Sequence, residues 1–330
     1  MRVLIIGATG FIGPYVVKHL LKQNHQLAVL HRGQTRADFP AHVQAIQADR
    51  NQLSGLRDAL IQFKPDVVLD VIPYTAQQAQ TLIQACSGLV PRVIALSSAD
   101  VYRNYDGLRG QSDTPPDPVP LLEDSPLRET RYPYRGAGLG FEWADDYDKI
   151  LVEQIIMDAP ALAGTILRLP AVYGPGDKQH RLRQYLKRMD NERPTILLST
   201  AQANWRWTWG YVENVAEAIA LAVTSAQAAG RIYNIGEDLE TIEQEWVMQI
   251  GQVVGWTGEV MTLAEDQLPK HLRKPMNFQY ELLTDTRRIR QELGYQESIN
   301  RPEALRRTIE WERGQPDNTP PPDYAAEGEG

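Results

Sequence analysis

The feature that most constrains this chain is a run near its start that passes from apolar residues into regularly spaced glycines. Val3–Ile6 is long enough for a buried parallel strand and too short for a core helix. Gly7 allows a sharp turn, Gly10 leaves room for a phosphate against the backbone, and Gly13 lets the next helix pack closely on the sheet. The first N–H groups of that helix would then face a diphosphate. The spacing predicts a dinucleotide site, and an ordinary tight turn without a ligand is the simpler alternative.

Strand-like and helix-like runs alternate through the first half of the chain. Further strands are expected at Leu27–Leu30, Val43–Gln47, Val67–Val71 and Val93–Leu96, with helices at Tyr15–Gln23, Leu53–Phe63 and Gln77–Ser87. This alternation predicts an α/β fold with a doubly wound parallel sheet.

The second half of the chain is less regular. Prolines and glycines interrupt Arg103–Gly140, and such a long excursion in a compact domain is usually functional or disordered. A helix is expected over Asp145–Asp158 and another over Val212–Thr224, with strands over Gly164–Leu169, Trp205–Tyr211 and Ile232–Ile235. The tail from Gly314 contains three consecutive prolines and is predicted to be unstructured.

Composition excludes several classes of protein. The 34 basic and 42 acidic side chains argue against a generally basic surface for nucleic acid. Cys86 is the only cysteine, so the chain has no intrachain disulfide and no cysteine-based zinc site, and no metal is expected. The apolar start runs into glycines instead of a signal peptide, and no apolar run is long enough to span a membrane. We therefore expect a cytoplasmic protein without membrane contact.

Six segments, in order along the chain, carry a family resemblance. They are GATGFIG at 7–13, SSADVY at 97–102, KILVE at 149–153, LRLPAVYGPGD at 167–177, YVENVAEAI at 211–219 and NIGED at 234–238. The later TDTRRIRQELGY at 284–295 is similar to the family's closing segment. Over about residues 1–313 the chain resembles the extended and atypical short-chain dehydrogenase/reductase superfamily, in its NAD-dependent epimerase/dehydratase group.

The resemblance implies two domains. A Rossmann domain, expected at residues 1–172 and 204–236, would bind a nicotinamide dinucleotide. A smaller, discontinuous substrate domain, expected at residues 173–203 and 237–313, would close over a nucleotide-sugar. Homodimers are common in the family, so a homodimer is an open expectation here.

The resemblance also suggests which residues bind the cofactor. The pyrophosphate would lie against Gly7, Thr9, Gly10, Phe11, Ile12 and Gly13, and Lys149 would bind the nicotinamide ribose. Asp49 matches the family residue near the adenine amino group, and Arg50 beside it could stack on the ring. NAD-binding members usually carry an acidic residue after the second strand, where this chain has Arg32. Because a guanidinium suits a ribose 2′-phosphate, NADP is predicted over NAD.

The catalytic residues of the family are matched only in part. Ser98 and Lys149 match the family's Ser and Lys, but Asp145 stands where the catalytic Tyr is expected, four residues before the Lys. In a regular helix Tyr147 would point away from Lys149, so it could reach the site only if the helix began near Asp148. Asp145 is itself a candidate base if burial makes its carboxylate more basic. Other phenols that a folded-back loop could present are Tyr102, Tyr132 and Tyr134.

On the substrate side, the candidates are Tyr173, Arg181 and Arg206. Tyr173 begins a turn that resembles the entrance to the substrate domain, and Arg206 lies within one position of the family's usual diphosphate-binding arginine. Arg181 belongs to a basic run over residues 178–188 that could neutralise a pyrophosphate or RNA phosphates, or be one solvated helix face. The residues that alternate with Arg206 form one aromatic face of a strand: Trp205, Trp207 and Trp209.

These features predict an NAD(P)-dependent oxidoreductase or epimerase with a non-standard catalytic tyrosine, acting on a nucleotide-sugar or a related hydroxyl or carbonyl substrate. The alternative is a non-catalytic NAD(P)-binding relative with a nucleotide- or RNA-binding role, because one atypical branch resembles the chloroplast stem-loop RNA-binding proteins. The Asp-Glu pair that family dehydratases use after the fifth strand is replaced by Ala99-Asp100, which favours epimerisation or reduction over dehydration.

Overall fold

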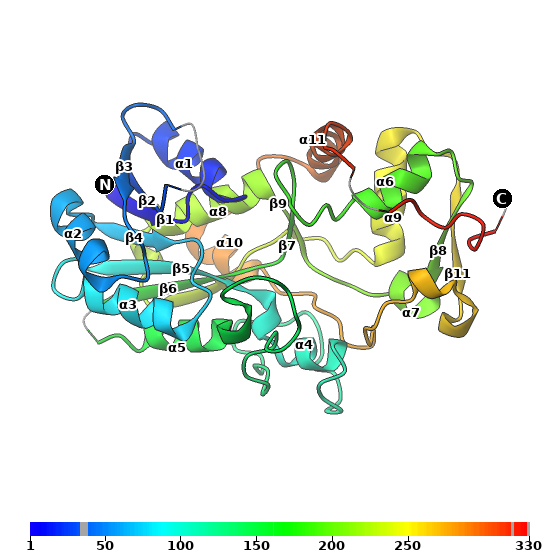
Figure 1. Ribbon diagram of the computed structural model, residues 1–330, viewed down its shortest axis with the longest axis horizontal. Coiled ribbons are helices and arrows are strands. Elements are labelled where there is room, and N and C mark those ends of the chain that lie inside the picture. Colours follow the sequence, from blue (N-terminus) through cyan, green and yellow to red (C-terminus); the bar gives the residue numbers. More distant parts are fainter. Residues whose placement is uncertain (34–38, 161, 318–319, 329–330) are drawn as a thin grey trace.

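A seven-stranded parallel sheet forms the centre of the computed structural model, which describes residues 1–33, 39–160, 162–317 and 320–328 (Figure 1). Its strands are β1 (Arg2–Ile6), β2 (Gln26–His31), β3 (Gln44–Gln47), β4 (Val67–Asp70), β5 (Arg92–Ser98), β6 (Ala163–Leu169) and β10 (Arg231–Asn234). Their order is β10-β6-β5-β4-β1-β2-β3, and every neighbouring pair is parallel. The strand order changes direction at β1, so the doubly wound sheet is confirmed.

Helices cover both faces of this sheet (Figure 1). In β1, Val3 and Ile5 join one buried cluster and Leu4 and Ile6 join another, because successive strand side chains point to opposite faces. The first cluster includes residues of α1 (Gly13–Lys22) and α8 (Val212–Thr224). The second includes residues of α2 (Leu53–Phe63), α3 (Ala76–Cys86) and α5 (Lys149–Met157). Burial on both faces explains why the strands are continuously apolar.

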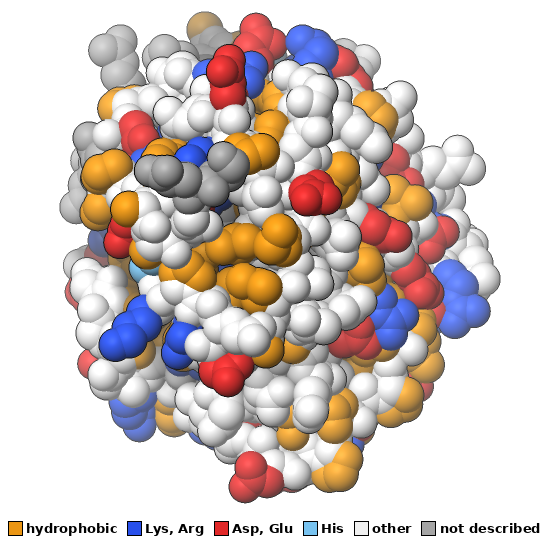
Figure 2. Space-filling model, turned by 90° about the vertical axis from the view of Figure 1, so that its right-hand side faces the viewer, with side chains coloured by type: hydrophobic (Ala, Val, Ile, Leu, Met, Phe, Trp, Pro, Cys, Tyr) orange, Lys and Arg blue, Asp and Glu red, His pale blue; other side chains and the backbone are white. Residues whose placement is uncertain are grey.

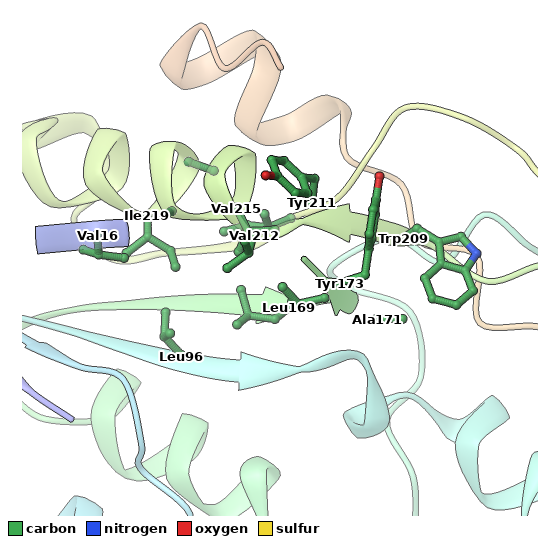
Figure 3. Close-up of a cluster of buried hydrophobic side chains, with 14 of the residues drawn as sticks. Val16, Leu96, Leu169, Ala171, Tyr173, Trp209, Tyr211, Val212, Val215 and Ile219 are labelled. Carbon is green, nitrogen blue, oxygen red and sulfur yellow. The ribbon is translucent and has the colours of Figure 1, made fainter. Parts of the chain in front are cut away.

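A second region lies beyond the carboxyl end of the sheet, at the right of Figure 1. It holds a two-stranded parallel sheet of β8 (Thr195–Ser199) and β11 (Glu259–Leu263), with α6 (Arg183–Asp190), α7 (Thr200–Ala203) and α9 (Glu243–Val254). Between the regions, β7 (Ala171–Tyr173) pairs with β9 (Trp209–Tyr211), so the strand expected over Trp205–Tyr211 is shorter than predicted. Figure 3 shows Tyr173 of β7 between Tyr211 and Trp209 of β9, with its ring centre 5.7 and 6.2 Å from theirs.

The remaining helices are short or C-terminal. They are α4 (Arg103–Leu108), α10 (Arg287–Leu293) and α11 (Arg301–Arg313), with single 3₁₀ turns at Ala99–Val101, Ala144–Asp146, Ala226–Ala228, Glu265–Gln267 and Lys270–Leu272. Within the described residues, no helix has the length and apolarity needed to cross a membrane.

The long excursion after β5 is packed and not loose. It begins with α4, which the proline and glycine content did not predict. Leu108 and Leu121 of this segment are buried together with Ile150 of α5 and Phe278 of a distant loop. These long-range apolar contacts hold a segment that has little regular structure of its own.

The helix predicted over Asp145–Asp158 begins four residues later, at Lys149. The side chain of Asp148 accepts a hydrogen bond from the backbone N–H of Ile150 (3.0 Å), so Asp148 is the N-cap and Tyr147 is extended. Arg128 fixes that cap, because its Nη2 donates to Asp148 Oδ1 at 2.8 Å. The predicted start was therefore wrong, and the reason is a partner 20 residues earlier in the chain.

The tail also differs from its prediction. Its described residues, 314–317 and 320–328, contain no helix or strand, but they contact α6 through side chains. The predicted lack of regular structure therefore does not mean a lack of tertiary contacts.

Candidate active site

A cavity of about 460 Å³ opens at the carboxyl ends of β1, β2, β3 and β4. These are the neighbouring strands at which the sheet reverses its order, the usual place for a ligand in a doubly wound fold. The cavity is lined by Ile6, Gly7, Thr9, Gly10, Leu30, His31, Arg32, Ala48, Arg50, Asn51, Ile72, Tyr74, Thr75, Gln77, Gln78, Glu142, Trp143 and Asp146.

The glycine loop has the shape that a diphosphate needs. Gly7 has φ +83°, and a Cβ there would lie 2.6 Å from a side-chain carbon of Ile72. A Cβ on Gly13 would lie 2.3 Å from the carbonyl oxygen of Ala8, so only glycine lets α1 begin so close to the turn. A Cβ on Gly10 would meet only a backbone oxygen at 3.7 Å, so open space remains on the cavity side. The loop therefore fits a dinucleotide pyrophosphate.

The three polar residues proposed to bind the adenosine half of the cofactor differ in their contacts and in whether they line the cavity. Arg32 lines the cavity, is exposed, and has no carboxylate within ion-pair distance in the part of the chain that the structure describes. The guanidinium of Arg50 also borders the cavity, but it donates to both oxygens of the buried Asp70 carboxylate at 2.6 and 2.5 Å. Asp49 is not among the lining residues, and its carboxylate accepts the backbone N–H of Asn51 at 2.9 Å.

An aromatic stack stands beside the cavity. Tyr74, from the segment after β4, stacks on Trp143 with ring centres 4.2 Å apart, and Trp143 stacks on Phe141 at 5.1 Å. The sequence analysis did not identify Trp143 as a pocket residue. The available signal was an aromatic pair that follows a glycine-rich stretch, at residues 136–143.

The fold brings two phenols to Lys149, since the ring centre of Tyr74 lies 5.0 Å and that of Tyr147 lies 5.8 Å from its Nζ. Because α5 begins at Lys149, Tyr147 lies in the extended segment before it, and its hydroxyl donates to Asp100 Oδ2 at 2.7 Å. The sequence analysis required a helix start near Asp148 for Tyr147 to reach the site, and α5 has that start.

Asp100 is the centre of a buried polar cluster. Oδ2 of Asp100 also accepts from the hydroxyl of Tyr134 at 3.2 Å, and that hydroxyl lies 2.7 Å from the hydroxyl of Tyr105. Oδ1 of Asp100 is buried and has no hydrogen-bond partner among the described residues. Burial raises the pKa of Asp100, and the nearby Arg128 only partly opposes that effect.

The phenol of Tyr147 keeps its proton in this environment. Burial, followed by the repulsion between a phenolate and the Asp100 carboxylate, raises the pKa of Tyr147 well above its usual range. The sequence analysis noted Asp100 only as a difference from the dehydratases. The signal that it missed was a carboxylate placed directly after a buried strand, at the same edge of the sheet as Asp70.

Lys149 is buried and held by neutral groups. Its Nζ donates to the carbonyl oxygens of Pro73 and Leu96, both at 2.9 Å. Burial lowers the pKa of Lys149 to about 8, although Asp100 and Asp70 oppose that shift. Ser98 is half-buried at the end of β5, where its Oγ accepts the backbone N–H of Asp100 at 3.2 Å.

The other catalytic candidates lie elsewhere. Asp145 is exposed in the 3₁₀ turn before Tyr147, and its carboxylate accepts the backbone N–H of Gly136 at 2.9 Å. The hydroxyl of Tyr102 donates to Oδ1 of Asn234 at 2.5 Å and accepts from Nη1 of Arg168 at 3.1 Å. The ring of Tyr132 lies under the guanidinium of Arg135, 4.0 Å from its centre.

A second cavity of about 800 Å³ lies between α6, the tryptophan segment and the loop over residues 271–278. Arg181 lines it, with its Nη1 2.9 Å from Asp177 Oδ1. Arg206 does not line it, because its guanidinium is bound to Glu281 at 2.7 Å on the opposite side of the segment. Tyr173 is fully buried and donates to Glu237 at 2.9 Å. The alternation predicted one aromatic face of a strand, but β9 contains only Trp209 of the three tryptophans; Trp205, Trp207 and Trp209 all line this cavity.

Comparison with known proteins gives a consistent family assignment. A model of the NAD dependent epimerase/dehydratase family matches residues 3–236. The 2'-dehydrokanamycin reductase of Streptomyces kanamyceticus is 27% identical over 246 residues, which is 71% of this chain and 61% of that protein. The chain thus spans about three fifths of the length of this relative.

Two further similar proteins are named for other activities, a stem-loop binding protein and an epimerase. The chloroplast stem-loop binding protein of 41 kDa b of Arabidopsis thaliana is 29% identical over 118 residues, or 32% of this chain and 31% of that protein. UDP-glucuronic acid 4-epimerase from Bacillus cereus, solved with UDP-glucuronic acid and NAD, has a TM-score of 0.69 at 17% identity and covers 95% of this chain and 99% of that chain. At this identity the structural likeness shows a shared fold.

Proposed function

Because the chain belongs to the NAD dependent epimerase/dehydratase family, we propose that it is an NADP-preferring oxidoreductase that reduces a carbonyl group of a nucleotide-sugar or a related compound. We further propose that Tyr147 takes the place of the family's catalytic tyrosine. The observation that carries this proposal is the position of Tyr147, whose hydroxyl donates to Asp100 Oδ2 at 2.7 Å and whose ring centre lies 5.8 Å from the Nζ of Lys149.

The cofactor would be held by the glycine loop and the cavity beside it. The backbone around Gly7, Thr9 and Gly10, which line the cavity, would contact the pyrophosphate. Lys149, to which the family resemblance gives the nicotinamide ribose, is buried and is not among the residues that line this cavity. When bound, a reduced nicotinamide supplies a hydride to the substrate carbon. The Bacillus cereus epimerase was solved with NAD, which supports a dinucleotide in this fold.

The preference for NADP rests on Arg32. This exposed side chain stands at the wall of the cavity without a carboxylate partner in the described residues, so its guanidinium is available to a 2′-phosphate. Arg50 is not an alternative, because Asp70 already occupies both of its terminal nitrogens.

Tyr147 would act as the general acid of such a reduction. Its phenol carries a proton at neutral pH and would give that proton to the substrate oxygen as the carbon–oxygen double bond is reduced. The hydroxyl of Tyr147 donates to the Asp100 carboxylate at 2.7 Å, so Asp100 would orient the phenol. The reductase relative from Streptomyces kanamyceticus supports this direction.

The test compares two phenols that share one carboxylate. Tyr147→Phe should lower kcat by about 10²–10⁴-fold with NADPH and a panel of 4-keto UDP-sugars and 2'-dehydrokanamycin, while NADPH affinity stays unchanged. Tyr134→Phe is the matched control and should lower kcat by less than about tenfold. Tyr134 also donates to Asp100, but it packs on the ring of Tyr147 instead of preceding Lys149 in the chain. The proposal fails if Tyr147→Phe keeps its turnover, or if Asp145→Asn is the substitution that abolishes it.

A second candidate function is RNA binding without redox chemistry. The match to the Arabidopsis thaliana stem-loop binding protein favours it. Against it, the formal net charge is −8, and on the face in Figure 2 the acidic and basic side chains are interspersed. RNA binding that weakens steeply with salt, together with no turnover on any carbonyl substrate, would favour this candidate over the reductase.

A further inference from the structure

The C-terminal segment, defined here as residues 315–317 and 320–328, contacts the basic side of α6. Nε of Arg188 donates to one oxygen of Glu327 at 2.8 Å and Nη2 to the other, while Nε2 of His271 lies 2.9 Å from the same carboxylate. Nζ of Lys187 lies 2.7 Å from Asp317 Oδ2. Two carboxylates of the segment thus pair with two of the α6 cations that line the second cavity, while the third, Arg183, pairs with Glu312 of α11.

The same segment forms one wall of that cavity. Pro320, Pro321, Pro322 and Asp323 line it, opposite Trp205, Trp207 and Trp209. Lys187 and Arg188 line it as well. An anionic ligand that entered the cavity and approached these two cations would meet the carboxylates of the segment already in place.

The segment is attached in a way that allows it to leave. In its described residues it has no helix or strand, and its backbone pairs with no strand of the three sheets. Apart from the charged pairs, its contacts with the α6 side include Arg183 Nη1 to the Pro316 oxygen (2.9 Å) and Asn191 Nδ2 to the Tyr324 hydroxyl (2.9 Å). Its release would expose side chains at the cavity rim without opening the core of the large sheet.

We propose that the basic side of α6 binds the phosphates of a nucleoside-diphosphate substrate, and that the C-terminal segment occupies this site as an internal competitor until the substrate displaces it. This inference rests on the proposed function, because it names how the anionic part of that substrate is bound. The tryptophans on the opposite wall offer flat apolar faces to the base or sugar of the same molecule. The carboxylates of Glu327 and Asp317 stand in for its phosphates.

The size of the effect follows from competition within one chain. If the docked segment occupies the site for nine tenths of the time or more, the apparent affinity of the substrate is reduced about tenfold or more. By linkage, a ligand that binds only the open site must increase the exposure of the segment by the same factor.

The experiment measures binding of UDP by calorimetry, with NADP⁺ at saturation so that the dinucleotide cavity is filled. Deletion of residues 315–330 should tighten UDP binding about tenfold or more. Glu327→Gln, which removes one charge and keeps the segment, should tighten it by a smaller factor. Glu310→Gln removes a carboxylate that is 76% exposed on α11 and pairs with Arg306, so it is the charge-matched control and should have no effect.

Amide hydrogen exchange provides a second readout that does not depend on the deletion folding. UDP should accelerate exchange in residues 320–328 of the full chain if it displaces the segment. Slower exchange with UDP, or UDP affinity that stays equal or falls after deletion, would show that the segment is a wall of the site and would overturn the inference. If the inference fails while Tyr147-dependent turnover persists, the proposed function stands. If no form of the protein binds UDP and none turns over a nucleotide-sugar, that substrate class is wrong as well.

Discussion

Each of the two cavities described above is lined by an arginine that forms a buried pair with a carboxylate, but the pairs differ in where the carboxylate comes from. Arg50 and Asp70 are 20 residues apart; Arg50 follows β3, and Asp70 is the last residue of β4. Arg188 and Glu327 are 139 residues apart, and Glu327 belongs to a segment without helix or strand. Exposure does not separate them, since the four side chains are all at most 8% exposed.

The comparison separates the burial of an ion pair from the anchoring of its partners. Asp70 is fixed by β4, so its loss would leave Arg50 buried and unpaired. Under the inference above, Glu327 would leave with its segment, and water or a ligand anion would then solvate Arg188.

The largest expected effect tests this difference directly. Asp70→Asn should lower the free energy of unfolding by about 3–5 kcal/mol, because it leaves an uncompensated guanidinium inside the protein. Glu327→Gln should lower it by less than about 1 kcal/mol, because the segment can detach. Urea unfolding of both variants measures the contrast, and equal losses would show that the two pairs are equally fixed.

The next effect concerns Lys149, the buried cation that neutral carbonyl oxygens hold. Its folded pKa of about 8 lies below the ordinary 10.5, because the folded protein disfavours the charged form. The cost of that charged form to stability is absent above pH 10.5 and reaches its full size as the pH falls below 8. The charged form therefore costs roughly 3 kcal/mol at neutral pH. The unfolding free energy of the wild type should rise between pH 7 and pH 10 relative to Lys149→Met. A constant difference across this range would mean that Lys149 is solvated in the folded protein.

Arg32 should produce a smaller effect, confined to one cofactor. Arg32→Ala should weaken NADP⁺ binding about 10–100-fold, the loss expected for a charge-assisted pair with a phosphate, and change NAD⁺ binding little. Arg306→Ala, on the exposed side of α11, is the matched control for the loss of a positive charge. An equal loss for both cofactors would remove the basis for the NADP preference.

The smallest effect is the release of the C-terminal segment by acid. Burial alone would raise the pKa of Glu327, but hydrogen bonds from Arg188 and His271 outweigh it and hold the pKa below 4.5. The docked state is therefore favoured above pH 4.5 and loses that contribution, under about 1 kcal/mol, as the pH falls below this value. Exchange in residues 320–328 should speed up in this range in the wild type and not in Glu327→Gln. Identical pH profiles would show that another group holds the segment.

The cofactor side of the molecule was the more predictable one. The glycine loop, the order of strands and helices and the cavity wall at Arg32 follow from short local patterns, since each strand or turn is specified by its own few residues. The start of α5 was not predictable in this way. Residues 145–158 are compatible with one longer helix, and the contact of Asp148 with Arg128 fixes Asp148 as the N-cap. Local sequence likewise did not show that Arg50 pairs with Asp70, or that Arg206 pairs with Glu281.

The sequence by itself determined the doubly wound sheet and the glycine turn at its mouth, because apolar runs and residues without a side chain act on the backbone within a few positions. Tertiary structure alone decided which phenol meets Asp100, which arginines are already paired, and that an acidic tail lies over α6. A charge or a hydroxyl can pair with any complementary group within reach, so its partner is chosen only when distant segments have packed together.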